Sequence, residues 1–112
     1  MTSNPKLTIG MPVYNGELFI KKAIVSILDQ TFTDFELIIS NNSSSDSTEK
    51  ICQDFIDKDN RIQIHTQKKN IGIHRNFNFL LSKAKGEYFA WAAVDDYLDN
   101  DFMEKNLKIL ES

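Results

Sequence analysis

The feature that most constrains this chain is the regular alternation of strand-like and helix-like segments along its whole length. Four apolar stretches have the length of strands, at residues 7–13, 35–39, 61–65 and 88–94. After each of them, apolar residues recur at the three- and four-residue spacing of an amphipathic helix. A β-α-β-α-β-α-β-α order requires a mostly parallel sheet covered by helices. We therefore predict an α/β fold, with a mostly parallel sheet and helices on both faces, in one domain of 112 residues.

Local signals place the helices and rank the strands. The helices are expected to begin near Glu17, at Asp46, after the loop 70–72 and near Asp101. Asp46 is expected to cap its helix, with Glu49 as the reciprocal partner. The stretch 61–65 alternates as a more exposed strand does, whereas 88–94 is apolar throughout and is predicted to be central in the sheet.

Polar residues gather directly after the predicted strands. In a parallel sheet, ligands bind beyond the carboxyl ends of the strands. The residues at these positions are Tyr14–Asn15, Asn41–Ser43, the segment near Asn70, and Asp95–Asp96. Asn41 is interpreted as a turn-forming residue. The functional site is therefore predicted at this edge of the sheet.

Asp95 and Asp96 come directly after the apolar stretch 88–94. Two adjacent carboxylates repel each other, and partial burial adds a desolvation penalty. A bound Mg²⁺ or Mn²⁺ removes this conflict, since both ions prefer oxygen ligands. By spacing alone, one aspartate would turn the chain or cap a helix while the other points into solvent. The position after the apolar strand favours a divalent metal site.

Composition excludes several classes of protein. A formal net charge of −3 argues against a general nucleic-acid binder. Cys52 is the only cysteine, so an intrachain disulfide and a cysteine-rich zinc site are excluded, and we interpret it as a core residue. No charged-then-apolar leader follows Met1, and the apolar runs are shorter than the ~18 residues of a membrane span. These features predict that the protein lies in the reducing environment of the cytoplasm, either free or at the cytoplasmic face of a membrane.

Four groups of residues, in this order, resemble the motifs of a known enzyme family. They are residues 12–16 with 26–31, residues 35–39 with 44–48, residues 70–72 with Arg75–Asn76, and residues 84–88 leading to Val94–Asp96. The ordered set resembles the N-terminal, nucleotide-sugar-binding half of a family 2 inverting glycosyltransferase with the GT-A (Rossmann-like) fold. The resemblance covers nearly the whole chain, so residues 1–112 are expected to form that part of a GT-A domain.

The resemblance implies a nucleotide-binding site. Pro12 and Tyr14 would line the nucleotide slot. Asn42 stands where the family often has an acid that reads the N3–H of uracil; its amide oxygen would accept from that group while its NH₂ donates to a ring carbonyl. Arg75, at the start of the third helix, would reach the base or the phosphates. The alternatives are a core-edge aromatic at 14, a turn-forming asparagine at 42 and a solvated arginine at 75.

The resemblance also implies a metal and a reaction. Asp96, together with Asp95, would hold Mn²⁺ or Mg²⁺ against the two phosphates of the donor. Asp95 would also contact the nucleotide. The metal stabilises the leaving nucleoside diphosphate. An acceptor hydroxyl, deprotonated by a carboxylate, would attack with inversion. The implied activity is hexosyl transfer from a nucleotide sugar, a UDP-sugar by family habit, to a saccharide or lipid-linked acceptor in polysaccharide biosynthesis.

The chain departs from the family pattern at several positions. Ala93 replaces a common third acid of the metal motif, Asn100 replaces a proline, and Asn41 and Asn42 stand where acids are common. Only 16 residues follow Asp96, whereas the family's acceptor site and catalytic base lie in a downstream half. We therefore expect a truncated domain with no catalytic residue in this chain. Alone, it is expected to bind a nucleotide weakly, transfer nothing and self-associate, and peripheral membrane association would belong to the missing part.

A small α/β sheet with an adjacent acidic pair also occurs in other classes of protein. A receiver domain needs a phosphoacceptor aspartate after its third strand, where this chain has Thr66–Lys68. A nucleotidyltransferase needs a glycine-rich phosphate loop after its first strand, where Gly16 stands alone. A non-catalytic nucleotide-binding or assembly module stays open as the alternative, and metal-dependent binding of UDP separates it from the enzyme.

Overall fold

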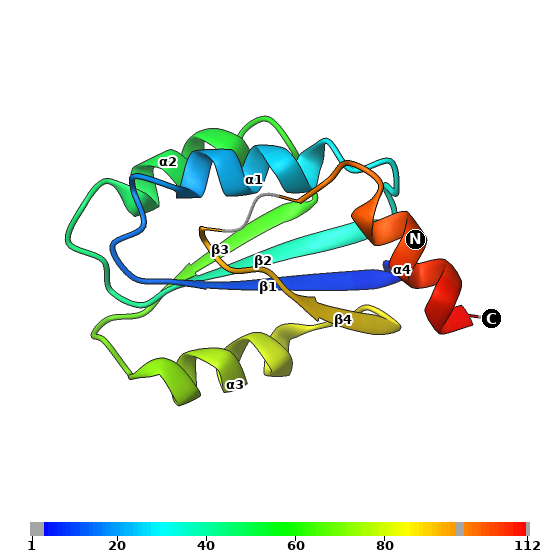
Figure 1. Ribbon diagram of the computed structural model, residues 1–112. Helices are drawn as coiled ribbons and strands as arrows, with labels where there is room; N and C mark the ends of the chain where they lie inside the picture. The colour runs from blue at the N-terminus through cyan, green and yellow to red at the C-terminus, as the bar shows by residue number, and fades with distance from the viewer. Residues whose placement is uncertain (1–3, 96–97, 112) are drawn as a thin grey trace.

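The computed structural model describes residues 4–95 and 98–111. Its elements alternate as predicted: β1 (Leu7–Val13), α1 (Ile20–Leu28), β2 (Phe35–Asn41), α2 (Thr48–Ile56), β3 (Ile62–Thr66), α3 (Ile73–Lys83), β4 (Tyr88–Trp91) and α4 (Phe102–Glu111). The four strands form one parallel sheet in the order β3-β2-β1-β4. Helices α1 and α2 cover one face of the sheet and α3 covers the other (Figure 1). The predicted α/β fold with helices on both faces is confirmed.

The main hydrophobic core lies between the sheet and the helices α1 and α2. It takes alternate residues of β1 and β2 and one stripe of α1: Leu7, Ile9, Met11, Val13, Phe35, Leu37, Ile39, Ile20, Ala23, Ile24 and Ile27. Alternate residues of a strand point to opposite faces. The intervening residues of β1 and β2, among them Thr8 and Glu36, therefore face the side of the sheet that α3 covers.

A buried polar cluster lies on the α3 side, at the start of the strands. Glu36 is only 8% exposed, and its carboxylate accepts hydrogen bonds from Thr8 Oγ1 at 2.6 Å, from the Lys85 N–H at 2.8 Å and from Gln63 Nε2 at 3.3 Å. The Gly86 N–H donates to Thr8 Oγ1 at 2.8 Å. A buried carboxylate is tolerated when hydrogen bonds satisfy it. This cluster therefore ties the loop after α3 to β1 and β2.

Strand β4 lies at an edge of the described sheet, so the prediction that it is central is wrong. It also ends earlier than predicted, at Trp91. Its apolar sequence has another cause, because both of its faces contact apolar neighbours. Tyr88 and Ala90 pack against the main core, while Trp91 on the other face contacts Phe77 of α3 edge to face. An apolar sequence therefore indicates that both faces of a strand are covered, and it does not indicate whether the strand is central or at an edge of the sheet. β3 lies at the other edge, in agreement with its alternating sequence.

One predicted helix start and one predicted helix cap are corrected. Helix α1 begins at Ile20 rather than near Glu17, and the reciprocal cap between Asp46 and Glu49 does not form. Asp46 does accept a hydrogen bond from the N–H of Thr48, the first residue of α2, at 3.0 Å. The Glu17 N–H also donates to the Asp46 carboxylate, at 3.2 Å, and the Glu17 carboxylate accepts in return from the Ser47 N–H at 3.0 Å. A tertiary partner from the loop after β1 therefore replaces the local one, and Glu49 bonds to the last residue of β3 instead.

Cys52 occupies the main core, as predicted. Its side chain is fully buried, and burial, followed by the nearby Glu49 carboxylate, raises the pKa of its thiol to about 12. The thiolate is the reactive form of cysteine. Cys52 therefore acts as a packing residue of α2.

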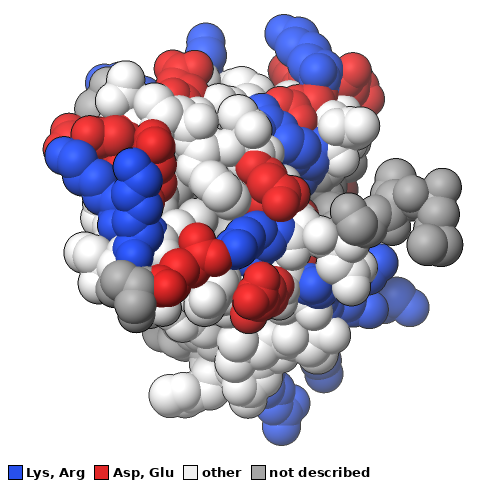
Figure 2. All heavy atoms as spheres, turned by 90° about the vertical axis from the view of Figure 1, so that its right-hand side faces the viewer, with Lys and Arg blue, Asp and Glu red and all other residues white. Residues whose placement is uncertain are grey.

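The face that carries α4 is charged with both signs interspersed (Figure 2). Ion pairs join Lys6 to Glu111, Lys105 to Asp101 and Lys108 to Glu104. The inner side of α4 contributes Met103 and Leu107 to the core. Among the described residues, no helix has the length and apolar character needed to cross a membrane.

Candidate functional site

A pocket lies at the carboxyl edge of the sheet, where β1 and β2 end beside the first turn of α3. Its volume is about 250 Å³, and it is lined by Pro12, Val13, Tyr14, Asn42, Ile73, Asn76 and Phe77. The loops that follow β1, β2 and β3 all lie at this edge (Figure 1). The structure thus brings Pro12, Tyr14 and Asn42, three residues predicted from sequence, into one pocket.

The walls of this pocket are largely apolar and aromatic. Tyr14 is 54% exposed on the β1 side, and Ile73 is 71% exposed on the α3 side. The ring of Phe77 contacts the ring of Trp91 on β4 edge to face, with the ring centroids 4.5 Å apart. Flat apolar walls with a few polar groups are typical of sites that bind a planar ring.

The loop that carries Tyr14 is fixed to the loop after β2. The Asn15 N–H donates to Ser44 Oγ at 2.8 Å, and the Ser45 N–H donates to Asn15 Oδ1 at 2.8 Å. Asn15 has a φ of 51°, a left-handed conformation that asparagine tolerates better than most residues. These reciprocal bonds hold the Tyr14 backbone in place before any ligand binds.

Asp46 is the charged centre of this pair of loops. Partial burial acts to raise its pKa, but hydrogen bonds from the Thr48 hydroxyl, the Thr48 N–H and the Glu17 N–H outweigh burial. The pKa of Asp46 is therefore lowered from its ordinary value of 3.8. The ionised carboxylate thus links the loop after β1 to the start of α2.

Asn42 is 5% exposed, and both the oxygen and the nitrogen of its side-chain amide form hydrogen bonds with the loop before α3. Its Oδ1 accepts from the Ile71 N–H at 2.9 Å. Its Nδ2 donates to Asn70 Oδ1 at 3.1 Å and to the Gly72 carbonyl at 3.4 Å. An asparagine NH₂ has two hydrogens, and here both are used. The predicted donation from Asn42 to a ring carbonyl is therefore not available in this arrangement, and one acceptor lone pair on Oδ1 remains.

Asn76 lines the pocket but received no role from the sequence. It is 3% exposed; its Oδ1 accepts from Ser40 Oγ at 2.5 Å, and its Nδ2 donates to the Ser40 carbonyl at 3.1 Å. Gln67 Nε2 also donates to Ser40 Oγ, at 3.2 Å. This buried network fixes the first turn of α3 to the end of β2. The signal in the sequence was a polar residue one helical turn before Leu80, on the inward stripe of the helix.

Of the other predicted residues that the structure describes, Arg75 and Asp95 do not line the pocket. Arg75 lies on the first turn of α3, as predicted, and its side chain is exposed. Asp95 is exposed in the turn after β4. Asp96 lies outside the described residues, so its role stays a prediction.

The start of the acidic pair lies beside the loop that carries Tyr14. A Cβ added to Gly16 would come within 2.8 Å of Val94 Cγ2, so the Val94 side chain packs directly on that backbone. Within residues 4–95 and 98–111, no three His, Cys, Asp or Glu side chains are grouped closely enough to hold a metal. The exposed Asp95 carboxylate fits a divalent cation whose remaining ligands come from outside the described side chains, such as phosphate oxygens and water.

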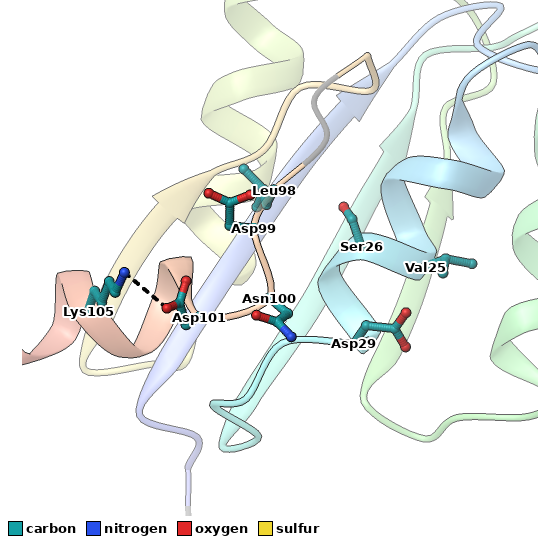
Figure 3. Close-up of a pocket in the computed structure, with 8 residues that line it drawn as sticks. All are labelled: Val25, Ser26, Asp29, Leu98, Asp99, Asn100, Asp101 and Lys105. Atoms are coloured by element: carbon teal, nitrogen blue, oxygen red, sulfur yellow. Dashed lines mark ion pairs between the residues drawn. The ribbon is translucent and has the colours of Figure 1, made fainter.

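A second pocket, of about 550 Å³, lies at the C-terminal end of α1 against the segment that leads into α4 (Figure 3). Asp29, Asp99 and Asp101 are among the residues that line it, and Asp101 Oδ2 pairs with Lys105 Nζ at 3.0 Å. This end of α1 is remote from the loops that follow β1, β2 and β3 (Figure 1). The larger pocket is therefore distinct from the predicted site.

Gln30 connects α1 to the segment that follows the acidic pair. It is 3% exposed; its Nε2 donates to the carbonyls of Ser26 at 3.1 Å and Asp99 at 2.6 Å, and its Oε1 accepts from the Met103 N–H at 3.0 Å. Gln30 thus fixes where the chain returns after Asp95. The sequence placed Gln30 in a motif without a role; the signal was a polar residue at the end of an apolar helical stripe.

Comparison with known proteins gives consistent matches over this chain. The family model described as Glycosyl transferase family 2 matches residues 8–112. An uncharacterized glycosyltransferase of Haemophilus influenzae is 36% identical over 106 residues, which cover 95% of this chain and 42% of that protein. Glycosyltransferase GlyA of Streptococcus pneumoniae is 32% identical over 104 residues, which cover 93% of this chain and 15% of GlyA. The chain thus spans less than half the length of these relatives.

Two solved structures share the fold. TarS 1–349 of S. aureus, in complex with UDP-GlcNAc, superposes with a TM-score of 0.88 at 24% identity, over 95% of this chain and 31% of that chain. The mannosyltransferase PcManGT of Pyrobaculum calidifontis, in complex with GDP-Man and Mn²⁺, gives 0.89 at 20% identity, over 99% of this chain and 34% of that chain. At these identities the similarity establishes the fold alone, which is the GT-A type expected from the sequence.

Proposed function

This chain belongs to glycosyl transferase family 2, and on that basis we propose that it forms the donor-binding part of an enzyme that transfers a sugar from a nucleotide sugar to an acceptor hydroxyl. The observation that carries the proposal is the pocket that gathers Pro12, Tyr14 and Asn42 at the carboxyl edge of the sheet. The nucleotide-sugar complexes of TarS and PcManGT support it, since both proteins share this fold.

The proposed nucleotide is UDP. Its base would lie against Pro12 and Tyr14, with Ile73 and Phe77 on the opposite wall. Stacking of a base on an aromatic side chain contributes about 1–3 kcal/mol. Arg75, exposed one turn into α3, would reach the base or the phosphates. The UDP-GlcNAc complex of TarS is compatible with a uridine donor and the GDP-Man complex of PcManGT with a guanosine donor, so UDP is proposed from the habit of the family.

The proposed metal ligands are Asp96 and Asp95. The contact between Val94 and Gly16 brings the start of this pair beside the Tyr14 loop, which supports a shared site. A divalent cation bound there, Mn²⁺ or Mg²⁺, supplies positive charge that stabilises the diphosphate leaving group. The Mn²⁺ in the PcManGT complex supports the use of a divalent metal. The residues of this chain bind and orient the donor, and Asp95 is also proposed to contact the nucleotide.

The remaining features of the reaction are proposed from the family. Transfer is of the hexosyl type, with inversion, to a saccharide or lipid-linked acceptor in polysaccharide biosynthesis. The single cysteine, buried and free, supports a cytoplasmic location.

We propose that the catalytic base lies outside these 112 residues. The acids after the pair have other roles. Asp99 lines the separate pocket at the C-terminal end of α1, and the Asp101 carboxylate pairs with Lys105. The isolated chain is expected to bind a nucleotide and to show no sugar transfer.

Titration calorimetry with UDP, with and without Mn²⁺, tests this function. We expect binding in the presence of Mn²⁺ that weakens about tenfold without the metal, because the diphosphate charge then loses its partner. The double variant Asp95→Asn, Asp96→Asn should bind UDP with Mn²⁺ as weakly as the wild type binds UDP alone. The matched control, Asp99→Asn with Asp101→Asn, should keep the metal effect. No binding of UDP under either condition would overturn the proposal and favour the assembly module.

A further inference from the structure

We propose that Asn42 is a positioning residue: its amide locks the Asn70–Gly72 segment and so fixes the α3 wall of the pocket, and it donates no hydrogen bond to a bound base. This inference rests on the proposed function, because it assigns the pocket to a nucleotide. It concerns how the pocket is held in shape before a ligand arrives.

The orientation of the Asn42 amide is determined by its partners. The Ile71 N–H donates at 2.9 Å, so the atom that it meets must be the amide oxygen. The Gly72 N–H donates to Asn70 Oδ1 at 2.8 Å, so that atom is also an oxygen. The group of Asn42 that faces Asn70 Oδ1 must therefore be the NH₂. Its second hydrogen meets the Gly72 carbonyl, which can only accept.

The segment that Asn42 holds is the starting point of α3. Gly72 is the residue before α3, with φ 85° and ψ 164°, a conformation that is essentially restricted to glycine. Its carbonyl accepts from Asn42 Nδ2 at 3.4 Å and from the Asn76 N–H at 3.1 Å. Ile73 and Phe77 follow on the same helix and line the pocket. Asn42 therefore connects the end of β2 to the position and direction of the opposite wall.

Burial makes this arrangement difficult to replace. Asn42 is 5% exposed, and its own N–H donates to the Val13 carbonyl at 2.8 Å, which extends the ladder between β1 and β2. The side chain therefore projects from a fixed backbone. A buried donor that loses its acceptor, or a pair of oxygens that meet without a hydrogen, destabilises the local structure.

Two isosteric substitutions separate this role from base reading. In Asn42→Asp the carboxylate keeps the acceptor for Ile71 but presents an oxygen to Asn70 Oδ1 and to the Gly72 carbonyl, where hydrogens are required. In Asn70→Asp the carboxylate still accepts from Asn42 and from Gly72, as Asn70 Oδ1 does now. The two variants add the same charge to the same hydrogen-bonded pair, Asn42 and Asn70. A base-reading residue, by contrast, would accept the N3–H of uracil with a carboxylate as well as with an amide.

The experiment measures amide hydrogen exchange by NMR on the ligand-free chain, followed by UDP affinity in the presence of Mn²⁺. We expect Asn42→Asp to speed amide hydrogen exchange at Ile71, Gly72 and Asn76 by about tenfold. The amides of α2 should keep their protection from exchange. Asn70→Asp should leave exchange at these amides within about threefold of the wild type. UDP affinity of Asn42→Asp should fall by about fivefold.

Three outcomes would overturn the proposal. The first is that Asn42→Asp leaves exchange at these amides unchanged. The second is that the two aspartate variants speed exchange equally, which would show an effect of charge alone. The third is that Asn42→Asp speeds exchange yet binds UDP as tightly as the wild type, or more tightly. Failure of the wild type to bind UDP would instead contradict the proposed function, and the exchange measurement would still test the loop anchor.

Discussion

Replacement of Gly86 with alanine is expected to lower the free energy of unfolding by about 3 kcal/mol, at the upper end of the range for overpacking. An added Cβ would lie 2.5 Å from the Thr8 backbone nitrogen and 2.8 Å from the Leu7 carbonyl carbon. These atoms belong to β1, which pairs with strands on both sides and cannot move aside. The displaced loop would also weaken the bonds from Lys85 and Gly86 to the buried Glu36 and Thr8 pair.

Urea denaturation of the wild type and of Gly86→Ala measures this difference in the free energy of unfolding. The control is Lys85→Ala, an exposed neighbour whose N–H bond to Glu36 is retained. It should lie within about 0.5 kcal/mol of the wild type. A Gly86→Ala chain as stable as this control would contradict the close approach between the loop after α3 and β1.

Replacement of Tyr14 with alanine is expected to weaken UDP binding between about tenfold and hundredfold, because a base–aromatic stack contributes about 1–3 kcal/mol. Tyr14 is 54% exposed, so the fold does not depend on its ring. The loss of affinity should therefore appear without a change in melting temperature. Calorimetry in the presence of Mn²⁺ measures the affinity, and thermal denaturation measures the stability.

Phe102 offers a matched control for Tyr14. It is also a half-exposed aromatic residue, 46% exposed, and it lies at the start of α4, away from the pocket. Phe102→Ala should bind UDP as the wild type does. Equal affinity of all three proteins for UDP would place the nucleotide somewhere other than against Tyr14.

The sequence predicted the order of the elements and the edge that carries the pocket. Both follow from periodicity and from a general rule of parallel sheets, which do not depend on detailed packing. That rule was enough to bring Tyr14 and Asn42 to one place, whereas Pro12, which lines the same pocket, was predicted from the family resemblance. Membership of the family and the GT-A type of fold, expected from the ordered motifs, are also confirmed.

The errors arose where local signals compete with distant partners. The carboxylate that accepts in return at the start of α2, from the Ser47 N–H, is Glu17 of another loop rather than Glu49 of the helix itself. The amide of Asn42 is used by a segment 28 to 30 residues further along the chain, which no local pattern indicates. The place of β4 at the edge depends on how the strands are ordered, and an apolar run does not encode that order. Asp96 stays a prediction, since it lies outside the described residues.

The central claim is that the pocket between the β1 loop and α3 holds the nucleotide of the sugar donor. Mapping of UDP onto the chain by amide chemical shifts, in the presence of Mg²⁺, tests it most directly. The largest shifts are predicted at pocket residues, namely Val13, Tyr14, Asn42, Ile73 and Phe77. Shifts concentrated instead around the larger pocket at the end of α1, at Asp29, Asp99 and Asp101, would contradict the claim.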